Sequence, residues 1–309
     1  MQMINIVNAD AFDRWNYTAT GDRRGYIQPY QLRELWFHTG TACNLSCDFC
    51  LEGSGPADKR IELIKLDEVR PFMDEALELG VEQFSFTGGE PFVARQIVSV
   101  LQYAANLRPC LVLTNATEPL HQRREQLKAL LDCQHPVSFR VSLDYPQQAA
   151  HDAGRGAGSF QMAIEGMQIL QQLGFHLSVA RQMTLDEDGA AVEAEYRQLF
   201  RRHGLDESLR LVAFPDFLPP GASADVPDIS ENCMTQYQNE ESRRQFMCAS
   251  SKMVVKKRGK LGVYACTLVD DDEDYNQGSS LREALTERVS MKHHRCFSCF
   301  SFGSSCSEI

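Results

Sequence analysis

The sequence predicts an α/β protein in which parallel strands alternate with helices. Short apolar runs recur along residues 32–215, and the segments between them have the apolar spacing of helices. Strands and helices that alternate at these lengths are typical of βαβ units, which right-handed crossovers wind into an open sheet or a barrel. Cysteine-containing and polar motifs follow several of the predicted strands. Because the carboxyl ends of parallel strands meet at one edge, we expect these motifs to lie together.

Each predicted element comes from a local signal. The six apolar runs predicted as strands lie, in chain order, at 32–37, 81–86, 110–113, 137–143, 176–183 and 209–214. The helices predicted between them lie at about 67–80, 94–107, 120–133, 159–174 and 190–203. Asp67 is the predicted N-cap and Gly80 the predicted C-cap of the first helix, and Ser159 is the predicted N-cap of the fourth.

The regions outside this alternation have a different character. Residues 1–31 are polar and aromatic without a clear period, and we predict an N-terminal extension packed on the body. The barrel or sheet domain is expected over 32–215, and the prolines of 216–247 indicate a linker. In the last segment, 248–309, two apolar runs flank a basic turn, which predicts a β-hairpin in a small second domain.

Composition and charge exclude several classes of protein. The chain has 309 residues, of which 43% are hydrophobic and 24% charged, an ordinary globular balance. It contains no apolar run of about eighteen residues, and its N-terminus lacks the features of a signal peptide. We therefore expect a cytoplasmic protein without a membrane partner. The net charge of −11 offers no electrostatic footprint for nucleic acid.

Three cysteines near the N-terminus carry the strongest chemical signal. The chain has eleven cysteines, which in a cytoplasmic protein favours metal ligation over disulfides. Cys43, Cys47 and Cys50 lie in CNLSCDFC. Three thiolates leave one iron of a four-iron cluster without a protein ligand, and an open coordination site predicts an enzyme. A zinc site with a distant fourth ligand is the alternative.

This spacing resembles the Cys-x3-Cys-x2-Cys signature of the radical S-adenosylmethionine (SAM) superfamily, and Phe49 fits the same pattern. The resemblance implies a 4Fe-4S cluster whose open iron binds the amino and carboxylate groups of SAM. It also implies that an electron from the cluster cleaves the sulfonium and releases a 5′-deoxyadenosyl radical. The implied fold is a partial (β/α)6 TIM-like barrel. A doubly wound dinucleotide fold is disfavoured, because the cysteine loop occupies the place of the glycine loop.

Two further segments after strands resemble SAM-binding motifs. Gly88 and Gly89 precede Glu90 and Pro91 after the second predicted strand. Such a sequence is first of all a tight turn, but it also resembles the GGEP segment of the superfamily. That resemblance implies that the backbone and Glu90 hold the amino group of SAM. Asn115, which follows the third strand, is similar to the TNG or TNA segment of relatives and is expected to line the same cleft.

The third segment runs from SLDYP to HDAGRGAGSF and resembles a stretch of relatives with cysteine-rich C-terminal domains. By this resemblance Ser142 and Asp144 bind the ribose hydroxyls, and Arg155 faces the methionine carboxylate, which a guanidinium matches in bidentate fashion. The alternatives are an Asx turn at Asp144 and a solvated Arg155. Tyr145 departs from the glycine usual at its position.

A second set of cysteines lies in the predicted hairpin domain. Its candidate metal ligands are Cys248, Cys266, Cys296 and Cys299, with Cys306 as a rival for the last place. Four thiolates suit either zinc or a second cluster. The segments GVYAC and YNQGSSLREAL resemble twitch and SPASM auxiliary-cluster domains. Because SPASM domains need more cysteines, the resemblance implies a twitch-like domain with one auxiliary 4Fe-4S cluster. Cys233 is a ligand, a reactive thiol or an inert residue.

The resemblance specifies how the reaction starts better than what it produces. It implies removal of a substrate hydrogen in an oxidoreductase-like reaction, with a reducing partner such as flavodoxin or ferredoxin. Oxidation or rearrangement of a small molecule is the first interpretation, with the auxiliary cluster accepting the second electron. Modification of a ribosomal peptide or of a protein side chain is the alternative. A non-catalytic iron–sulfur electron carrier or scaffold is the alternative of another class.

Charged residues of the C-terminal segment raise two more expectations. Sulfatase-maturing relatives carry an aspartate directly after the hairpin cysteine, but Thr267 stands there in this chain. Asp270 could replace that aspartate only if its loop folds back. Residues 270–274 are all acidic and are expected to face water, because charge runs are usually solvated. The sequence His293-His294-Arg295 is expected to form a cationic surface patch.

Overall fold

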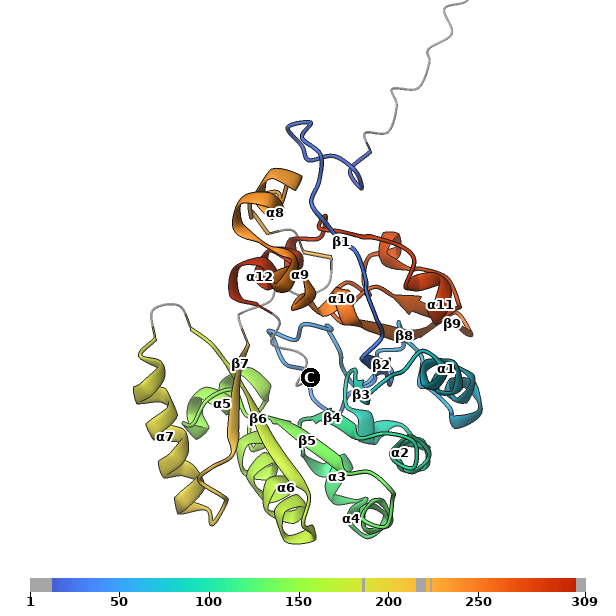
Figure 1. The fold of residues 1–309 in the computed structure, drawn as a ribbon. Coiled ribbons are helices and arrows are strands. Elements are labelled where there is room, and N and C mark those ends of the chain that lie inside the picture. Colours follow the sequence, from blue (N-terminus) through green and yellow to red (C-terminus); the bar gives the residue numbers. More distant parts are fainter. Residues whose placement is uncertain (1–12, 185–186, 215–220, 223, 304–309) are drawn as a thin grey trace, which may run out of the picture.

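A computed structural model describes residues 13–184, 187–214, 221–222 and 224–303. Its main feature is an eight-stranded sheet in the order β7-β6-β5-β4-β3-β2-β8-β9 (Figure 1). These strands are β2 (Glu34–His38), β3 (Gln83–Thr87), β4 (Cys110–Thr114), β5 (Val137–Ser142), β6 (His176–Gln182), β7 (Arg210–Phe214), β8 (Ser251–Lys257) and β9 (Lys260–Tyr264). All six predicted strands are present, with ends that differ from the prediction by at most two residues.

The strand order confirms the predicted α/β partial barrel. From β2 to β7 each strand pairs in parallel with the next strand of the chain. A doubly wound sheet reverses its strand order at a switch point, and β2 to β7 contain no such reversal. Within the described residues no pairing joins the edge strands β7 and β9, so the sheet stays open.

Helices cover the outer side of this sheet (Figure 1). They are α1 (Leu66–Glu78), α2 (Ile97–Ala105), α3 (Glu118–His121), α4 (Arg124–Leu127), α5 (Gln148–Arg155), α6 (Ser159–Leu173) and α7 (Gly189–Arg202), with short 3-10 turns at Pro91–Val93 and Lys128–Leu130. The main core lies between strands and helices and includes the fully buried Phe37, Phe86 and Phe139. Burial of such side chains, worth roughly 1.5–3 kcal/mol each, stabilises the layered arrangement.

Several predicted helix ends are wrong. The first helix begins at Leu66 with Lys65 as N-cap, so Asp67 lies in the first turn, where its charge favours the helix dipole. Gly158, with φ +83°, is the N-cap of α6 in place of Ser159. The single helix predicted over 120–133 is divided, because Arg123 has the non-helical dihedrals φ −102° and ψ 7°. The helix α5 was not predicted at all.

The C-terminal segment contributes to the barrel sheet. The predicted hairpin is present as β8 and β9, and β8 also pairs in parallel with β2. A separate two-stranded sheet joins β1 (Tyr26–Ile27) to β10 (Val289–Ser290). The remaining elements are α8 (Glu231–Tyr237), α9 (Glu240–Arg244), α10 (Met247–Ser250), a 3-10 turn at Glu273–Tyr275, α11 (Leu281–Ala284) and α12 (His294–Phe302). The predicted linker therefore contains helices, and the division into domains stays a prediction.

No helix among the described residues has both the length and the apolar composition needed to cross a bilayer.

Gly166 provides a test of how closely α6 packs against the loop after β4. A Cβ atom at this position would lie 1.9 Å from the carbonyl oxygen of Ala116, in the loop after β4. Because backbone cannot move aside cheaply, we expect Gly166→Ala to lower the free energy of unfolding by about 1–3 kcal/mol, measured in urea. Gly189→Ala is the control, since nothing lies within 4 Å of that added atom. Equal stability of the two variants would contradict this contact.

Candidate active site

The N-terminal cysteines lie in the loop that follows β2. Cys43 is buried, and Cys47 and Cys50 are half-buried. The backbone N–H of Leu45 donates to Cys43 Sγ at 3.4 Å, and the N–H of Ser54 donates to Cys50 Sγ at 3.4 Å. Hydrogen bonds to sulfur are one of the means by which proteins tune thiolate-bound clusters. The loop therefore presents three close sulfur atoms, two of which accept backbone hydrogen bonds.

Electrostatics show that these thiols suit a bound metal centre. Burial raises the pKa of the Cys43 thiol to about 12, and the nearby Cys47 and Cys50 add to the effect. Burial also raises the pKa of Cys47. Thiols in such surroundings ionise only when a positive charge compensates them, and metal binding supplies that charge. Three sulfur atoms with this chemistry fit a 4Fe-4S cluster with one open iron.

Two glycines after β3 allow the cysteine loop to approach closely. A Cβ at Gly88, where φ is +138°, would lie 2.7 Å from the Gly40 carbonyl oxygen, and one at Gly89 would lie 2.5 Å from that of Ala42. The Gly89 N–H donates to the same Gly40 oxygen at 2.8 Å. Larger residues here would push the two loops apart, which explains the need for glycine in the predicted GGEP segment.

Glu90 connects the loops after β3 and β4. Its carboxylate accepts hydrogen bonds from the Phe92 N–H at 3.0 Å, the Asn115 N–H at 2.8 Å and the Thr114 hydroxyl. Burial raises the pKa of Glu90 to about 7, which these hydrogen bonds partly offset. The side chain is only 1% exposed and does not line the cavity described below. Its predicted contact with an amino group stays a prediction.

Asn115 also faces the cysteine loop. Its Nδ2 donates to Asn44 Oδ1 at 3.1 Å and lies 3.8 Å from Cys43 Sγ. Its Oδ1 accepts from the Thr117 hydroxyl at 2.7 Å. The side chain therefore positions the loop around Cys43, and it is not among the residues that line the cavity.

Asp144 and Arg155 form a bidentate pair. Asp144 follows β5, and Arg155 is the last residue of α5. Arg155 Nη2 donates to Asp144 Oδ1 at 2.9 Å, and Nε donates to Oδ2. Burial by itself would lower the pKa of Arg155, but Asp144 raises it above its ordinary value. The guanidinium also lies 5.5 Å from the centre of the Phe49 ring, so it contacts the cysteine loop.

His151 forms a hydrogen bond with the backbone of Asp144. The Asp144 N–H donates to His151 Nδ1 at 3.2 Å. Burial, followed by the charge of Arg155, lowers the pKa of His151 to about 4. The imidazole is therefore neutral near pH 7, and its Nδ1 lone pair is available as a hydrogen-bond acceptor.

A cavity of about 230 Å³ brings the predicted groups together at the carboxyl ends of the strands. The predicted residues that line it are Cys47, Cys50, Gly88, Gly89, Ser142, Asp144 and Arg155. The other lining residues are Phe49, Leu51, Glu52, Thr87, Leu113, Ala180, Arg181, Gln182 and Phe214. Thr87, Gln182 and Phe214 each end a strand. The rule that barrel sites lie at strand ends could have found them in the sequence.

The four C-terminal cysteines converge from separate elements. Cys248 lies in α10, Cys266 follows β9, and Cys296 and Cys299 lie in α12. Burial raises the pKa of the Cys248 thiol well above its ordinary value, and the other three cysteines add to the effect. Burial likewise raises the pKa of Cys296 and of Cys299 to about 12. One buried and three half-buried thiols that influence one another suit a thiolate-bound metal centre, either zinc or an iron–sulfur cluster.

Two other thiols of this region were named in the sequence. Cys233 lies in α8, where its Sγ is 3.3 Å from the Ser230 hydroxyl. It packs against the same apolar cluster as the four C-terminal cysteines. Cys306 lies outside the described residues, so its role as an alternative ligand to Cys299 stays a prediction.

The expected exposure of the C-terminal charges is wrong for Asp270 and Arg295, whereas Glu273 and Asp274 are exposed as expected. Asp270 is 2% exposed and Arg295 is 2% exposed. Arg295 donates to the Leu268 carbonyl at 3.0 Å and to the Leu51 carbonyl at 3.0 Å, so it joins the acidic loop to the cysteine loop. Burial would raise the pKa of Asp271, but a hydrogen bond from His293 and the charge of Arg295 hold it below its ordinary value. Arg295 and Asp271 face inward because each has a partner there.

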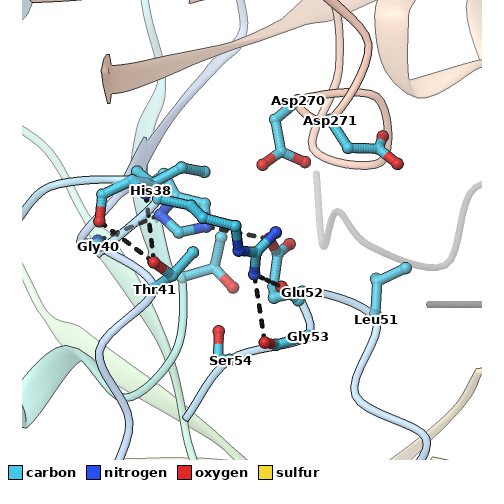
Figure 2. Close-up of polar contacts among 12 residues, drawn as sticks. His38, Gly40, Thr41, Leu51, Glu52, Gly53, Ser54, Asp270 and Asp271 are labelled. Carbon is cyan, nitrogen blue, oxygen red and sulfur yellow. Dashed lines mark hydrogen bonds and ion pairs between the residues drawn. The ribbon is translucent and has the colours of Figure 1, made fainter. Parts of the chain in front are cut away.

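The acidic loop folds back toward the cavity. Figure 2 shows Asp270 directed toward His38 and Glu52, whereas Asp271 points away. Polar atoms of His38, Glu52 and Asp270 lie within 4.8 Å of one another, and Glu52 lines the cavity. His38 Nδ1 accepts the Gly40 N–H at 3.1 Å, so a neutral ring carries its proton on Nε2, 3.1 Å from Glu52. In this arrangement His38 orients Glu52 and offers no lone pair to a metal ion.

The Asp144–Arg155 pair yields a test of stability. Asp144→Asn leaves a guanidinium that is 14% exposed without its counter-charge. Removal of one partner of a buried pair costs about 3–5 kcal/mol, so we expect a loss of about 3 kcal/mol in the free energy of unfolding. Asp67→Asn is the control, because that carboxylate is 93% exposed and 3.6 Å from Arg70. Matching losses in both variants would contradict a tight internal pair.

Comparison with known proteins agrees with this geometry. Residues 37–188 match the model of the Radical SAM superfamily. The AdoMet-dependent heme synthase of Nitratidesulfovibrio vulgaris is 27% identical over 194 residues, which cover 60% of this chain and 48% of that protein. The mycofactocin maturase MftC of Mycolicibacterium smegmatis is 30% identical over 193 residues, which cover 60% of this chain and 45% of that protein. The chain thus spans about half the length of these curated relatives.

Solved structures share the fold at low sequence identity. Streptococcus suis SuiB bound to S-adenosylmethionine has a TM-score of 0.61 and 15% identity, over 83% of this chain and 66% of that one. The anSMEcpe structure with bound AdoMet has a TM-score of 0.58 and 13% identity, over 86% of this chain and 82% of that one. With the family match, the strand order and the cysteine loop, these findings identify the chain as a member of the radical SAM superfamily.

Proposed function

We propose that this chain cleaves SAM reductively and thereby removes a hydrogen atom from a substrate. One observation carries the proposal: Cys47, Cys50 and the Asp144–Arg155 pair line one cavity at the carboxyl ends of the strands. Bound by Cys43, Cys47 and Cys50, a 4Fe-4S cluster supplies the electron that such cleavage requires. An electron carrier needs no side chains arranged for an amino acid and a ribose, which argues against the alternative of another class.

The residues around the cavity would bind and orient SAM. Arg155 is the guanidinium proposed for the methionine carboxylate, and it already has Asp144 as a bidentate partner. A ligand carboxylate would compete with Asp144 for Arg155 and leave the Asp144 oxygens for the ribose hydroxyls, together with Ser142. The close backbone contact at Gly88 and Gly89 would place main-chain groups beside the amino end of the ligand.

We further propose that Cys248, Cys266, Cys296 and Cys299 hold an auxiliary 4Fe-4S cluster. Their packing on one apolar cluster and their mutual influence support a four-thiolate metal site. Zinc remains the alternative occupant of such a site. An iron–sulfur cluster there would accept the second electron of a substrate oxidation, and a reductant such as flavodoxin or ferredoxin would supply the first electron. Thiols of this kind fit the reducing cytoplasm.

The proposed substrate is a small molecule that undergoes oxidation or rearrangement. A peptide or protein side chain is the second candidate. The relative named mycofactocin maturase and the structure of SuiB bound to the precursor peptide SuiA favour it. The two candidates share every residue proposed above for SAM, and they differ only in what occupies the rest of the cavity.

Anaerobic incubation with dithionite and SAM tests the proposed activity. We expect 5′-deoxyadenosine to form in the presence of dithionite and to be absent without it, as measured by liquid chromatography and mass spectrometry. Iron and sulfide are counted in the same sample. If both cysteine sites are filled with iron and no 5′-deoxyadenosine forms, the carrier hypothesis replaces the enzyme.

A further inference from the structure

A basic surface hollow lies beside the turn between β8 and β9. It has a volume of about 800 Å³, and its charged lining residues are Arg60, Lys257, Arg258, Lys260 and Glu273. Lys257 Nζ lies 2.8 Å from Glu273 Oε1, so these two charges offset each other. Arg60 Nη2 lies 2.6 Å from Asp58 Oδ2, a carboxylate outside the lining. The lining therefore carries more positive than negative charge, although the whole chain has a net charge of −11.

Arg258 and Lys260 supply the positive charge that remains. Both residues are exposed. Within the described residues, no salt bridge joins either side chain to a carboxylate. The backbone of the turn is tied to the barrel, because the N–H of Gly259 donates to Glu62 Oε1 at 2.6 Å. The turn therefore presents two cations without ion-pair partners to a molecule that approaches the hollow.

The hollow lies close to the loop of the proposed catalytic cluster. Because β8 runs parallel to β2, the turn after β8 is at the same edge of the sheet as the cysteine loop after β2. Arg60 Nη2 donates to the Gly53 carbonyl at 3.2 Å, and the Gly53 N–H donates to the Cys50 carbonyl at 2.9 Å. Two hydrogen bonds therefore connect a lining residue of the hollow to a proposed cluster ligand.

We infer that this hollow is the docking site of an acidic electron-transfer protein that reduces the cluster at Cys43, Cys47 and Cys50. The inference rests on the proposed function, which consumes one electron for each SAM molecule that is cleaved. In the docked complex the reduced carrier gives up that electron and the cluster gains it. A basic hollow beside the cluster loop suits this encounter, because complexes of electron carriers are small and weak and opposite charges speed their association.

An acidic peptide is the other macromolecule that such a charge would attract. No residue lines both this hollow and the cavity proposed for SAM. Hydrogen removal takes place inside that cavity, whereas an electron can enter the cluster from outside it. A position beside the cluster loop but apart from the cavity therefore favours the electron carrier.

Charge reversal at the turn tests the docking site in the full-length protein. We expect Arg258→Glu/Lys260→Glu to weaken binding to an immobilised acidic flavodoxin at least about tenfold at low ionic strength, measured by surface plasmon resonance. The rate of 5′-deoxyadenosine formation with flavodoxin, its reductase and NADPH should fall with it. The rate with dithionite should stay at the parent value, because a small reductant needs no docking site.

Arg124→Glu/Lys128→Glu is the matched control, because it changes the net charge equally at two exposed residues outside the hollow. Equal weakening of flavodoxin binding in both double variants would overturn the inference, as would a parent that binds neither flavodoxin nor ferredoxin. A fall in the dithionite rate equal to the fall with flavodoxin would also overturn it.

Binding of a fluorescent oligoglutamate peptide, followed by anisotropy, separates the two kinds of partner. Loss of peptide binding in Arg258→Glu/Lys260→Glu, with flavodoxin binding unchanged, would assign the hollow to an acidic peptide and overturn the inference. A parent that forms no 5′-deoxyadenosine with dithionite would refute the proposed function itself, and that result is obtained without any carrier protein.

Discussion

Replacement of Cys43, Cys47 and Cys50 by alanine is expected to abolish SAM cleavage and to leave the C-terminal iron in place. The three sulfur atoms are the proposed protein ligands of the catalytic cluster, and two of them line the cavity. Without a cluster at this loop no electron reaches the sulfonium, so 5′-deoxyadenosine should fall to the level seen without dithionite. The iron content should fall by the amount of one cluster.

The control is a variant that removes a cysteine outside both proposed metal sites. Cys110 is 2% exposed in the barrel core, is not a candidate ligand and is not among the residues that line the cavity. We expect Cys110→Ala to keep its iron and its cleavage activity. Loss of all iron from the triple variant would show that the two cysteine sites depend on each other, contrary to the proposal.

Replacement of Cys296 and Cys299 by alanine is expected to have the opposite effect: the C-terminal iron is lost and SAM cleavage is retained. These residues lie in α12 and supply two of the four proposed auxiliary ligands. The double variant should lose the C-terminal iron, because two thiolates cannot hold a cubane cluster there, and should still form 5′-deoxyadenosine. Iron and sulfide analysis together with the anaerobic cleavage assay measures both expectations on one sample.

Cys233→Ala is the control for this second experiment. Its Sγ lies near Ser230 in α8, and it is not among the four proposed ligands. We expect the variant to retain both clusters. Loss of the C-terminal iron from Cys233→Ala would place that thiol in the ligand set, and retention of it in Cys296→Ala/Cys299→Ala would exclude α12 from the site.

Local patterns in the sequence were enough to predict the barrel strands and the groups at their ends. The apolar runs and the spacing of Cys43, Cys47 and Cys50 are properties of neighbouring residues, and the structure has strands where those runs occur. The GGEP segment was predicted from its resemblance to relatives, and the structure adds the reason for its glycines, since the backbone of the loop after β2 leaves no room for a Cβ atom. Periodicity and spacing among neighbouring residues can be recognised without a three-dimensional structure.

Contacts between distant segments could not be predicted from such local patterns. The sequence predicted separate ligand contacts for Asp144 and Arg155, yet these two residues bind each other. The acidic run at 270–274 was expected to face water, yet Asp270 and Arg295 are buried against the cysteine loop. Whether a charge is solvated depends on the partner that the fold places beside it, and such a partner can lie more than two hundred residues away in the chain.

The sequence by itself therefore determined the parallel α/β architecture and supplied the two candidate cysteine sets, because periodicity and spacing are local. Only the tertiary structure decided that β8 pairs with β2, which joins the hairpin to the barrel sheet. The tertiary structure likewise decided that Asp270, which follows the hairpin, lies near His38 and Glu52. The physical reason is that strand pairing and charge compensation are satisfied between elements, and no local pattern encodes which elements will meet.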